Sequence, residues 1–118
     1  MFRDVRGHAQ AAVVLPDTFT MYHWKYITSL ALKYRVPVIY GILDFVDAGG
    51  WMAYGVDQSA LYRGAAVYVD KILRGANPAT LPIQQATQFA LAVNLKVAKA
   101  LGITIPESIL LRADEVIR

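Results

Sequence analysis

The chain has 118 residues, of which 56% are hydrophobic and 18% are charged, and it contains no cysteine. This composition excludes an intrinsically disordered segment, which has few large apolar residues, and a small domain stapled by disulfides. The length suits one packed domain. Without cysteine there is no thiol catalysis and no thiolate metal site, and the two histidines, His8 and His23, lack the spacing of a zinc site. We therefore expect neither a metal nor a cofactor.

The formal net charge is +3, but the 12 Lys and Arg residues are spread from Arg3 to Arg118 with no two adjacent. Nucleic-acid-binding surfaces usually cluster their basic residues, so we expect no nucleic-acid partner. Charged residues also interrupt every apolar run before it reaches the length of a membrane-spanning helix. The first eight residues lack the apolar core of a secretory signal, so we expect a cytoplasmic chain if Met1 is its true start.

The N-terminal half predicts alternating strands and helices. Residues 11–16 are a short apolar run that ends in proline, which is typical of a buried strand. Asp17 and Thr18 follow as a helix N-cap signal. From 19 to 34 apolar side chains recur every three or four residues, which predicts one amphipathic helix that stops before Pro37.

A second strand is predicted at residues 36–40, bounded by Gly41. Strand, helix and strand with short links indicate a right-handed parallel βαβ unit. A single helical turn over 44–47 and a third strand over 51–54 follow.

The clearest helix prediction covers residues 58–74, with Asp57 as N-cap and Gly75 at its C-terminal end. One stripe of this helix is apolar, and it consists of Leu61, Ala65, Tyr68, Val69 and Ile72. After a turn-rich connection, residues 89–93 predict a fourth strand.

The C-terminal end predicts two helices. Asn94 caps a short helix that runs to Leu101 and ends at Gly102, and a last helix runs from Pro106 to about Ile117. The fold class is therefore α/β, with three to four mainly parallel strands and flanking helices. This is a small sheet for a parallel arrangement, which indicates that the chain is part of something larger.

Enzyme chemistry has little support. Asp44 and Asp47 could share a helical face, but they are equally explained as the solvated side of one helical turn, and no nucleophile accompanies them. No dinucleotide or phosphate-loop glycine pattern is present.

A ligand-binding interpretation fares better, because open α/β sheets bind small molecules beyond the carboxyl ends of their strands. Aromatic and polar residues gather at these ends: Pro16, Asp17, Thr18 and Phe19; Tyr40, Gly41, Asp44 and Phe45; Tyr54, Gly55 and Asp57. The alternative is that Asp17 and Asp57 only cap helices and that the aromatic residues belong to the core.

Four stretches carry a family resemblance: residues 48–57 (AGGWMAYGVD), 61–82 (LYRGAAVYVDKILRGANPATLP), 93–106 (VNLKVAKALGITIP) and 111–116 (LRADEV). In this order they resemble the C-terminal end of the ABC transporter substrate-binding proteins related to the tryptophan- and tyrosine-binding group. The resemblance extends from about Ala11 to Arg118.

The resemblance implies a type I periplasmic-binding fold, in which two Rossmann-like lobes close on a solute that is then handed to a membrane permease. It implies a periplasmic location and no enzymatic activity. By position, the chain is a single partial domain: 11–57 resemble part of the second lobe, 58–85 a crossover helix and its connection, and 86–118 the closing strand and helices. The second-lobe ligand contacts implied for a small, amino-acid-like solute are Asp17, Thr18, Phe19, Tyr40, Asp44, Phe45 and Tyr54.

Family members are much longer and begin with a secretory signal, so we expect a natural truncation or a fragment, equivalent to about the last third of a receptor. The apolar stripe on 58–74 would then lack its partner sheet, and an exposed stripe favours association. We expect a homodimer or higher assembly in which copies cover each other's sheet edge or helix face, with exchange of 58–118 as one route. The alternative function is a self-associating structural protein that keeps the fold without binding a solute.

Overall fold

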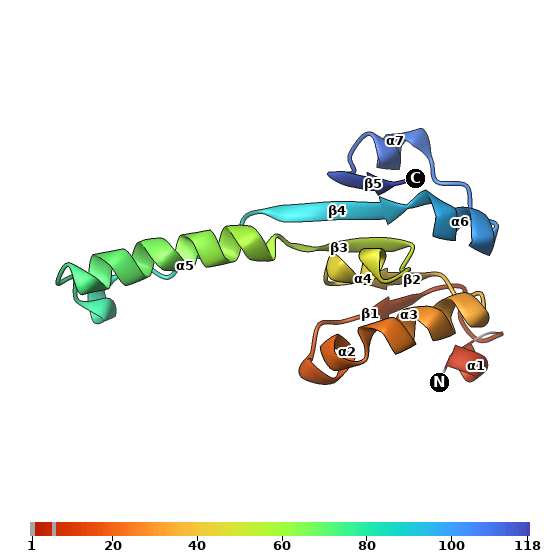
Figure 1. The fold of residues 1–118 in the computed structure, drawn as a ribbon, viewed down its shortest axis with the longest axis horizontal. Helices are drawn as coiled ribbons and strands as arrows, with labels where there is room; N and C mark the ends of the chain where they lie inside the picture. The colour runs from red at the N-terminus through yellow and green to blue at the C-terminus, as the bar shows by residue number, and fades with distance from the viewer. Residues whose placement is uncertain (1, 6) are drawn as a thin grey trace. The chain divides into compact units, whose positions relative to one another are not determined.

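A computed structural model describes residues 2–5 and 7–118 of the chain. It divides into two compact units, one formed by Met1–Gly55 with Ala90–Arg118 and the other by Val56–Phe89. Figure 1 shows the elements in chain order. Within the described residues, no helix is both long enough and apolar enough to span a membrane.

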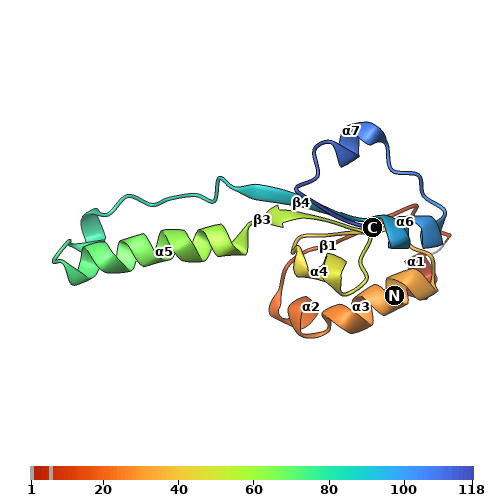
Figure 2. The same cartoon turned by 45° about the horizontal axis from the view of Figure 1, so that its top comes forward.

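The first unit contains a five-stranded sheet in the order β1-β2-β3-β4-β5. The strands are β1 (Ala12–Val14), β2 (Val38–Tyr40), β3 (Met52–Val56), β4 (Phe89–Asn94) and β5 (Glu115–Ile117). The pairs β1–β2, β2–β3 and β4–β5 are parallel. The arrows of β3 and β4 point in opposite directions (Figure 2), so the sheet is mainly parallel, as predicted.

Short helices surround this sheet: α1 (Phe2–Val5), α2 (Thr18–Tyr22), α3 (Trp24–Lys33), α4 (Asp44–Asp47), α6 (Leu95–Leu101) and α7 (Glu107–Leu110). In Figure 2, α2, α3 and α4 lie on one side of the sheet and α7 lies on the other. Helices on both sides let the central strands bury apolar residues on both faces.

The core of the first unit has two clusters. The larger contains Val38, Tyr40, Phe45, Val46 and Ala53, with Ala31 of α3. The smaller centres on Val93, Ala98 and Ile105, against which Trp51 and Met52 pack. Burial of each large apolar side chain favours folding by about 1.5–3 kcal/mol, so these clusters hold the sheet and its helices together.

The four predicted strands are confirmed, as are the turn over 44–47 and the short helix that follows Asn94. Asn94 accepts a hydrogen bond from the Val97 N–H at 3.2 Å, and Gly102 is left-handed at φ 75°. A residue at the end of a helix adopts this backbone conformation most easily when it has no Cβ.

The single helix predicted over 19–34 is wrong, because the structure divides it into α2 and α3 at His23. Asp17 starts α2 as predicted, through a capping box with Thr20. His23 then leaves helical geometry, with ψ at 17°, and its ring packs on Phe19 and Tyr22, with centroid distances of 4.5 and 5.0 Å. These aromatic contacts accompany a break that the apolar periodicity did not reveal.

The last helix, predicted from Pro106 to about Ile117, is also wrong. Helix α7 ends at Leu110, and residues 115–117 form β5, which makes five strands instead of three or four. Asp114 exchanges hydrogen bonds with Leu91: its N–H donates to the Leu91 carbonyl and its carboxylate accepts from the Leu91 N–H, both at 2.8 Å. Pairing with a strand more than 20 residues away overrides the local helical pattern.

The second unit consists of α5 (Gln58–Leu73), a 3₁₀ turn η1 (Pro78–Thr80) and an extended segment that follows it. The predicted caps of this helix are confirmed. Asp57 accepts from the Ala60 N–H at 3.0 Å. At the other end Gly75 has φ 97°, its N–H bonds to the Ile72 carbonyl and the Ala76 N–H bonds to the Lys71 carbonyl, which is a Schellman motif.

Candidate functional site

The carboxyl ends of β1, β2 and β3 meet along one edge of the sheet, because these parallel strands are in register at Val14, Tyr40 and Ala53. The loops that leave them are tightly packed. A Cβ on Gly41 would lie 2.7 Å from Cδ of Pro16, and a Cβ on Gly55 would overlap the Gly41 carbonyl oxygen. Glycine is therefore required at both positions, because neighbouring atoms leave no room for a side chain at this edge of the sheet.

Asp17, Thr18 and Phe19 follow β1 and are exposed. Asp17 accepts hydrogen bonds from the Phe19 N–H at 2.6 Å and the Thr20 N–H at 3.0 Å, so it does serve as a helix cap. The cap fixes the position of its carboxylate at the end of β1. The Phe19 side chain is 68% exposed and contacts the ring of His23.

Tyr40 and Phe45 lie in the core instead of at the surface. Their side chains are 1% and 2% exposed, and their rings stack with centroids 4.7 Å apart. Burial raises the pKa of Tyr40 well above its ordinary value, so its hydroxyl stays neutral. In this conformation the two stacked rings support the carboxyl edge of the sheet from within the core.

Asp44 is exposed at the start of α4, and Tyr54 is 57% exposed on β3 between the buried residues Ala53 and Gly55. The exposed members of the predicted set are thus Asp17, Thr18, Phe19, Asp44 and Tyr54. Across residues 2–5 and 7–118, no three or more His, Asp or Glu side chains gather as a metal site.

His23 is a site neighbour that the sequence analysis did not include. It lies four residues after Phe19, a spacing that places two side chains on one helical face, and this spacing was the available signal. The packing role of Gly41 and Gly55 had no comparable signal, because it depends on contacts between different loops.

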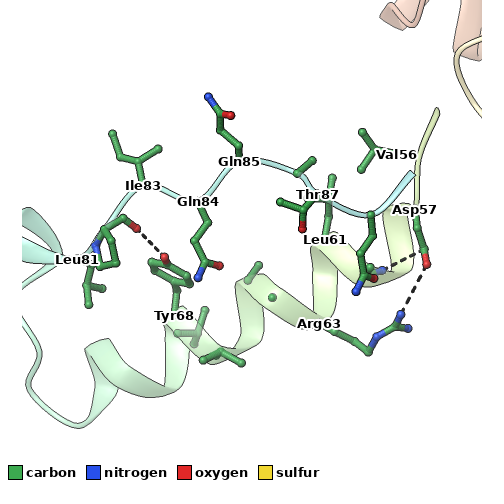
Figure 3. A pocket seen from close by; sticks show the side chains of 18 of the residues that line it. Val56, Asp57, Leu61, Arg63, Tyr68, Leu81, Ile83, Gln84, Gln85 and Thr87 are labelled. Carbon is green, nitrogen blue, oxygen red and sulfur yellow. Dashed lines mark hydrogen bonds and ion pairs between the residues drawn. The ribbon is translucent and has the colours of Figure 1, made fainter. Parts of the chain in front are cut away.

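The second unit has its own groove, of about 940 Å³, between α5 and residues 78–88. Figure 3 shows Leu61, Tyr68 and Ile83 among the side chains that line it, with Arg63 paired to Asp57 at 3.7 Å. The Tyr68 hydroxyl donates to the Pro82 carbonyl at 2.6 Å and ties the extended segment to the helix. Four members of the predicted stripe, Leu61, Ala65, Val69 and Ile72, remain exposed, so this unit presents an apolar surface.

The sheet and its flanking helices define a periplasmic-binding-protein fold. One similar structure is a conserved domain protein from Vibrio cholerae O1 biovar El Tor, with a TM-score of 0.89 and 28% identity. Another is the ABC domain in complex with L-Trp from Streptococcus pneumoniae, with a TM-score of 0.87 and 28% identity. The ligand-free, open structure of an adhesive substrate-binding protein from Clostridium difficile, at 0.70 and 21% identity, shares the fold.

The family model for ABC transporter substrate binding protein matches residues 1–117. The chain therefore belongs to this family, whose members generally bind solutes and are not enzymes. Each of the three structures is matched over 98% of this chain, which spans only 39%, 40% and 39% of theirs, in the order given. No curated protein sequence matches the chain.

Proposed function

We propose that this chain forms part of the solute site of an ABC transporter receptor, which binds a small organic solute outside the membrane and delivers it to a permease. The observation that carries the proposal is the exposed group at the carboxyl ends of β1, β2 and β3, in a chain whose family binds solutes. The location, periplasmic or extracellular, follows from the same family membership. We assign the chain no catalytic role.

The chemistry of the exposed group favours an amino-acid-like solute. Phe19 and Tyr54 offer aromatic surface for an apolar side chain, while Asp17 and Asp44 offer carboxylates for an ammonium group. The L-Trp complex of the pneumococcal protein supports this choice of class. Tyr40 and Phe45 then act from the core, by holding the loops on which the exposed residues stand.

The chain supplies only one side of such a site, because it spans about two fifths of the length of the similar structures. We assign residues 11–57 and 86–118 to one lobe and 58–85 to the crossover. The division into two compact units supports this assignment, since Val56–Phe89 forms a unit of its own. The exposed apolar face of α5 is then a surface for the other lobe.

The 118-residue chain is expected to bind L-Trp, L-Tyr or L-Phe weakly, with Kd near 1 mM, because one lobe makes about half of the contacts. NMR titration should shift the backbone signals of residues 17–19 and 54. Phe19→Ala and Tyr54→Ala should each weaken binding about tenfold, as expected from a lost aromatic contact.

Tyr26→Ala is the matched control, because Tyr26 is an exposed aromatic residue of α3 outside this group, and it should leave Kd unchanged. If none of the three amino acids shifts any signal at saturating concentration, the amino-acid proposal fails.

A second candidate function, self-association without solute binding, is favoured by the exposed apolar face of α5. A second copy would cover Leu61, Val69 and Ile72 and remove them from water. This homo-oligomer and the proposed two-lobed receptor would use the same face of α5, so the two candidates exclude each other at that surface.

Leu61→Asp should raise the dimer dissociation constant by about 10- to 100-fold, because it places a charge in the apolar contact and removes a large side chain from it. Ser59→Asp adds the same charge to an exposed position of α5 and should leave association unchanged. Sedimentation equilibrium at micromolar concentration measures both. A parent chain that is already a stable monomer contradicts the self-association candidate.

A further inference from the structure

The loops at the carboxyl ends of β1, β2 and β3 carry exposed carboxylates and no permanent positive charge. Asp17 and Asp44 are exposed there, whereas residues 7–24 and 36–62 contain no Lys or Arg. An amino-acid-like solute has both an ammonium and a carboxylate, and an ionised Asp side chain can accept hydrogen bonds only from the ammonium. On this edge of the sheet, a donor for the carboxylate must come from another side chain or from the backbone.

The backbone at the start of α2 does not supply this donor. The N–H groups of Phe19 and Thr20 both donate to the Asp17 carboxylate, at 2.6 and 3.0 Å. The Thr20 hydroxyl is engaged as well, since it accepts from the Asp17 N–H at 3.0 Å and donates to the backbone. The capping box therefore uses the polar groups that would otherwise bind an anion here.

His23 stands next to Phe19, which offers aromatic surface to the proposed solute. The backbone fixes its place, because its N–H donates to the Phe19 carbonyl at 3.1 Å and its carbonyl accepts from the Ile27 N–H at 2.9 Å. Its ring centroid lies 4.5 Å from that of Phe19, so a solute that packs on Phe19 lies beside the imidazole. The other histidine, His8, precedes β1 and so belongs to the opposite end of that strand.

The imidazole of His23 can take a ligand, because the side chain is only half-buried. Its ring nitrogens make no hydrogen bond with residues 2–5 and 7–118, and neither of them is a buried unpaired atom, so both reach solvent. An imidazole donates at least one N–H whether it is neutral or protonated, and the protonated ring adds a positive charge. His23 thus has the chemistry that the aspartates of this edge lack.

We propose that His23 donates a hydrogen bond to the carboxylate of the solute while Asp17 and Asp44 pair with its ammonium, an inference that rests on the solute site proposed above. His23 then acts as a specificity-determining residue, because it strengthens binding of an aromatic amino acid but not of the corresponding amine. The Thr18 hydroxyl is the competing donor at this edge, but it cannot take up a positive charge.

NMR titration of the chain with L-Trp and with tryptamine, which lacks the carboxylate, tests the proposal. His23→Phe keeps an aromatic ring against Phe19 and removes both nitrogens. It should raise the Kd of L-Trp about fivefold, as expected from one lost hydrogen bond, and leave the Kd of tryptamine unchanged. His23→Gln restores a donor and should bind L-Trp more tightly than His23→Phe does. Thr18→Val, the matched control, should leave the ratio of the two Kd values as in the parent chain.

Equal weakening of both ligands by His23→Phe would give His23 a merely structural role, and an unchanged Kd for L-Trp would exclude the contact. Either result overturns the proposal, as does a change of the Kd ratio in Thr18→Val in place of His23→Phe.

A second measurement needs no variant that might fail to fold. L-Trp should shift the ring signals of His23 in the parent chain more than tryptamine does, with those of His8 as the unmoved reference. A chain that binds L-Trp without this difference contradicts the role of His23 alone. A chain that binds neither ligand contradicts the proposed amino-acid site, and the role of His23 with it.

Discussion

Gly55→Ala is expected to destabilise the chain by about 3 kcal/mol or more, because the new Cβ would overlap the Gly41 carbonyl oxygen and the ends of β2 and β3 would have to separate. The clash is between backbone groups, of Gly55 within β3 and of Gly41 directly after β2, so no flexible side chain can give way. Urea unfolding followed by circular dichroism measures the change. The same displacement should disturb the loops that carry the proposed solute contacts.

Substitution of two other glycines distinguishes the cost of lack of space from the cost of backbone strain. Gly49 has open space but φ 99°, so Gly49→Ala should cost only about 1–2 kcal/mol. Gly64 has open space within α5 and no positive φ, so Gly64→Ala should be neutral or should stabilise the helix by up to about 1 kcal/mol. Equal effects at Gly55 and Gly64 would contradict the close packing of the strand ends.

Asn94→Ala is expected to cost about 2 kcal/mol, because the buried Asn94 side chain has two roles. Its oxygen accepts from the Val97 N–H at the start of α6, and loss of such a cap costs about 1 kcal/mol. Its amide donates to the Val46 carbonyl at 3.4 Å, and loss of this buried hydrogen bond adds about 1 kcal/mol, since the carbonyl still accepts from the Gly49 N–H at 3.1 Å. Urea unfolding gives the total, and hydrogen exchange at Val97 reports the lost cap.

Asn77→Ala is the matched control, since Asn77 also caps a helical turn, by accepting from the Ala79 N–H at 3.0 Å, but is exposed to solvent on the turn η1. Its cost should stay below about 1 kcal/mol. Asn94→Asp keeps the side-chain oxygen that accepts from the Val97 N–H and loses the amide that donates to the Val46 carbonyl. This variant therefore measures the cap separately from the contact with Val46. If Asn94→Ala costs no more than Asn77→Ala, the contact with Val46 contributes nothing.

Helix α5 shows what local sequence can predict well. Its apolar spacing, the Asp57 cap and the C-terminal Gly75 all act within a few residues, and the structure places the helix at Gln58–Leu73 against the prediction of 58–74. The capping role of Asn94 was predictable for the same reason, because an N-cap bonds to an amide three residues further on. The contact of Asn94 with Val46, 48 residues away, was not.

The candidate site shows the same difference between what local sequence predicts and what only tertiary contacts determine. The sequence identified the carboxyl ends of the strands and the residues that stand there, but it could not tell which aromatic side chains face the core. Tyr40 and Phe45 stack inside, whereas Phe19 and Tyr54 stay exposed. In a short strand or a single helical turn, apolar character alone does not distinguish the two faces, because packing against other elements makes that choice.

By itself, the sequence determined the α/β class, the order of most elements and the family, because caps, glycine positions and hydrophobic periodicity are local and the family motifs are long. Only the tertiary structure decided that residues 115–117 form a strand, that His23 breaks a helix, and that Gly41 and Gly55 are crowded at the strand ends. These features depend on contacts or backbone geometry that the hydrophobic pattern of one segment does not record. Strand pairing and close packing join residues far apart in the chain, and their free energy exceeds the small differences in local preference.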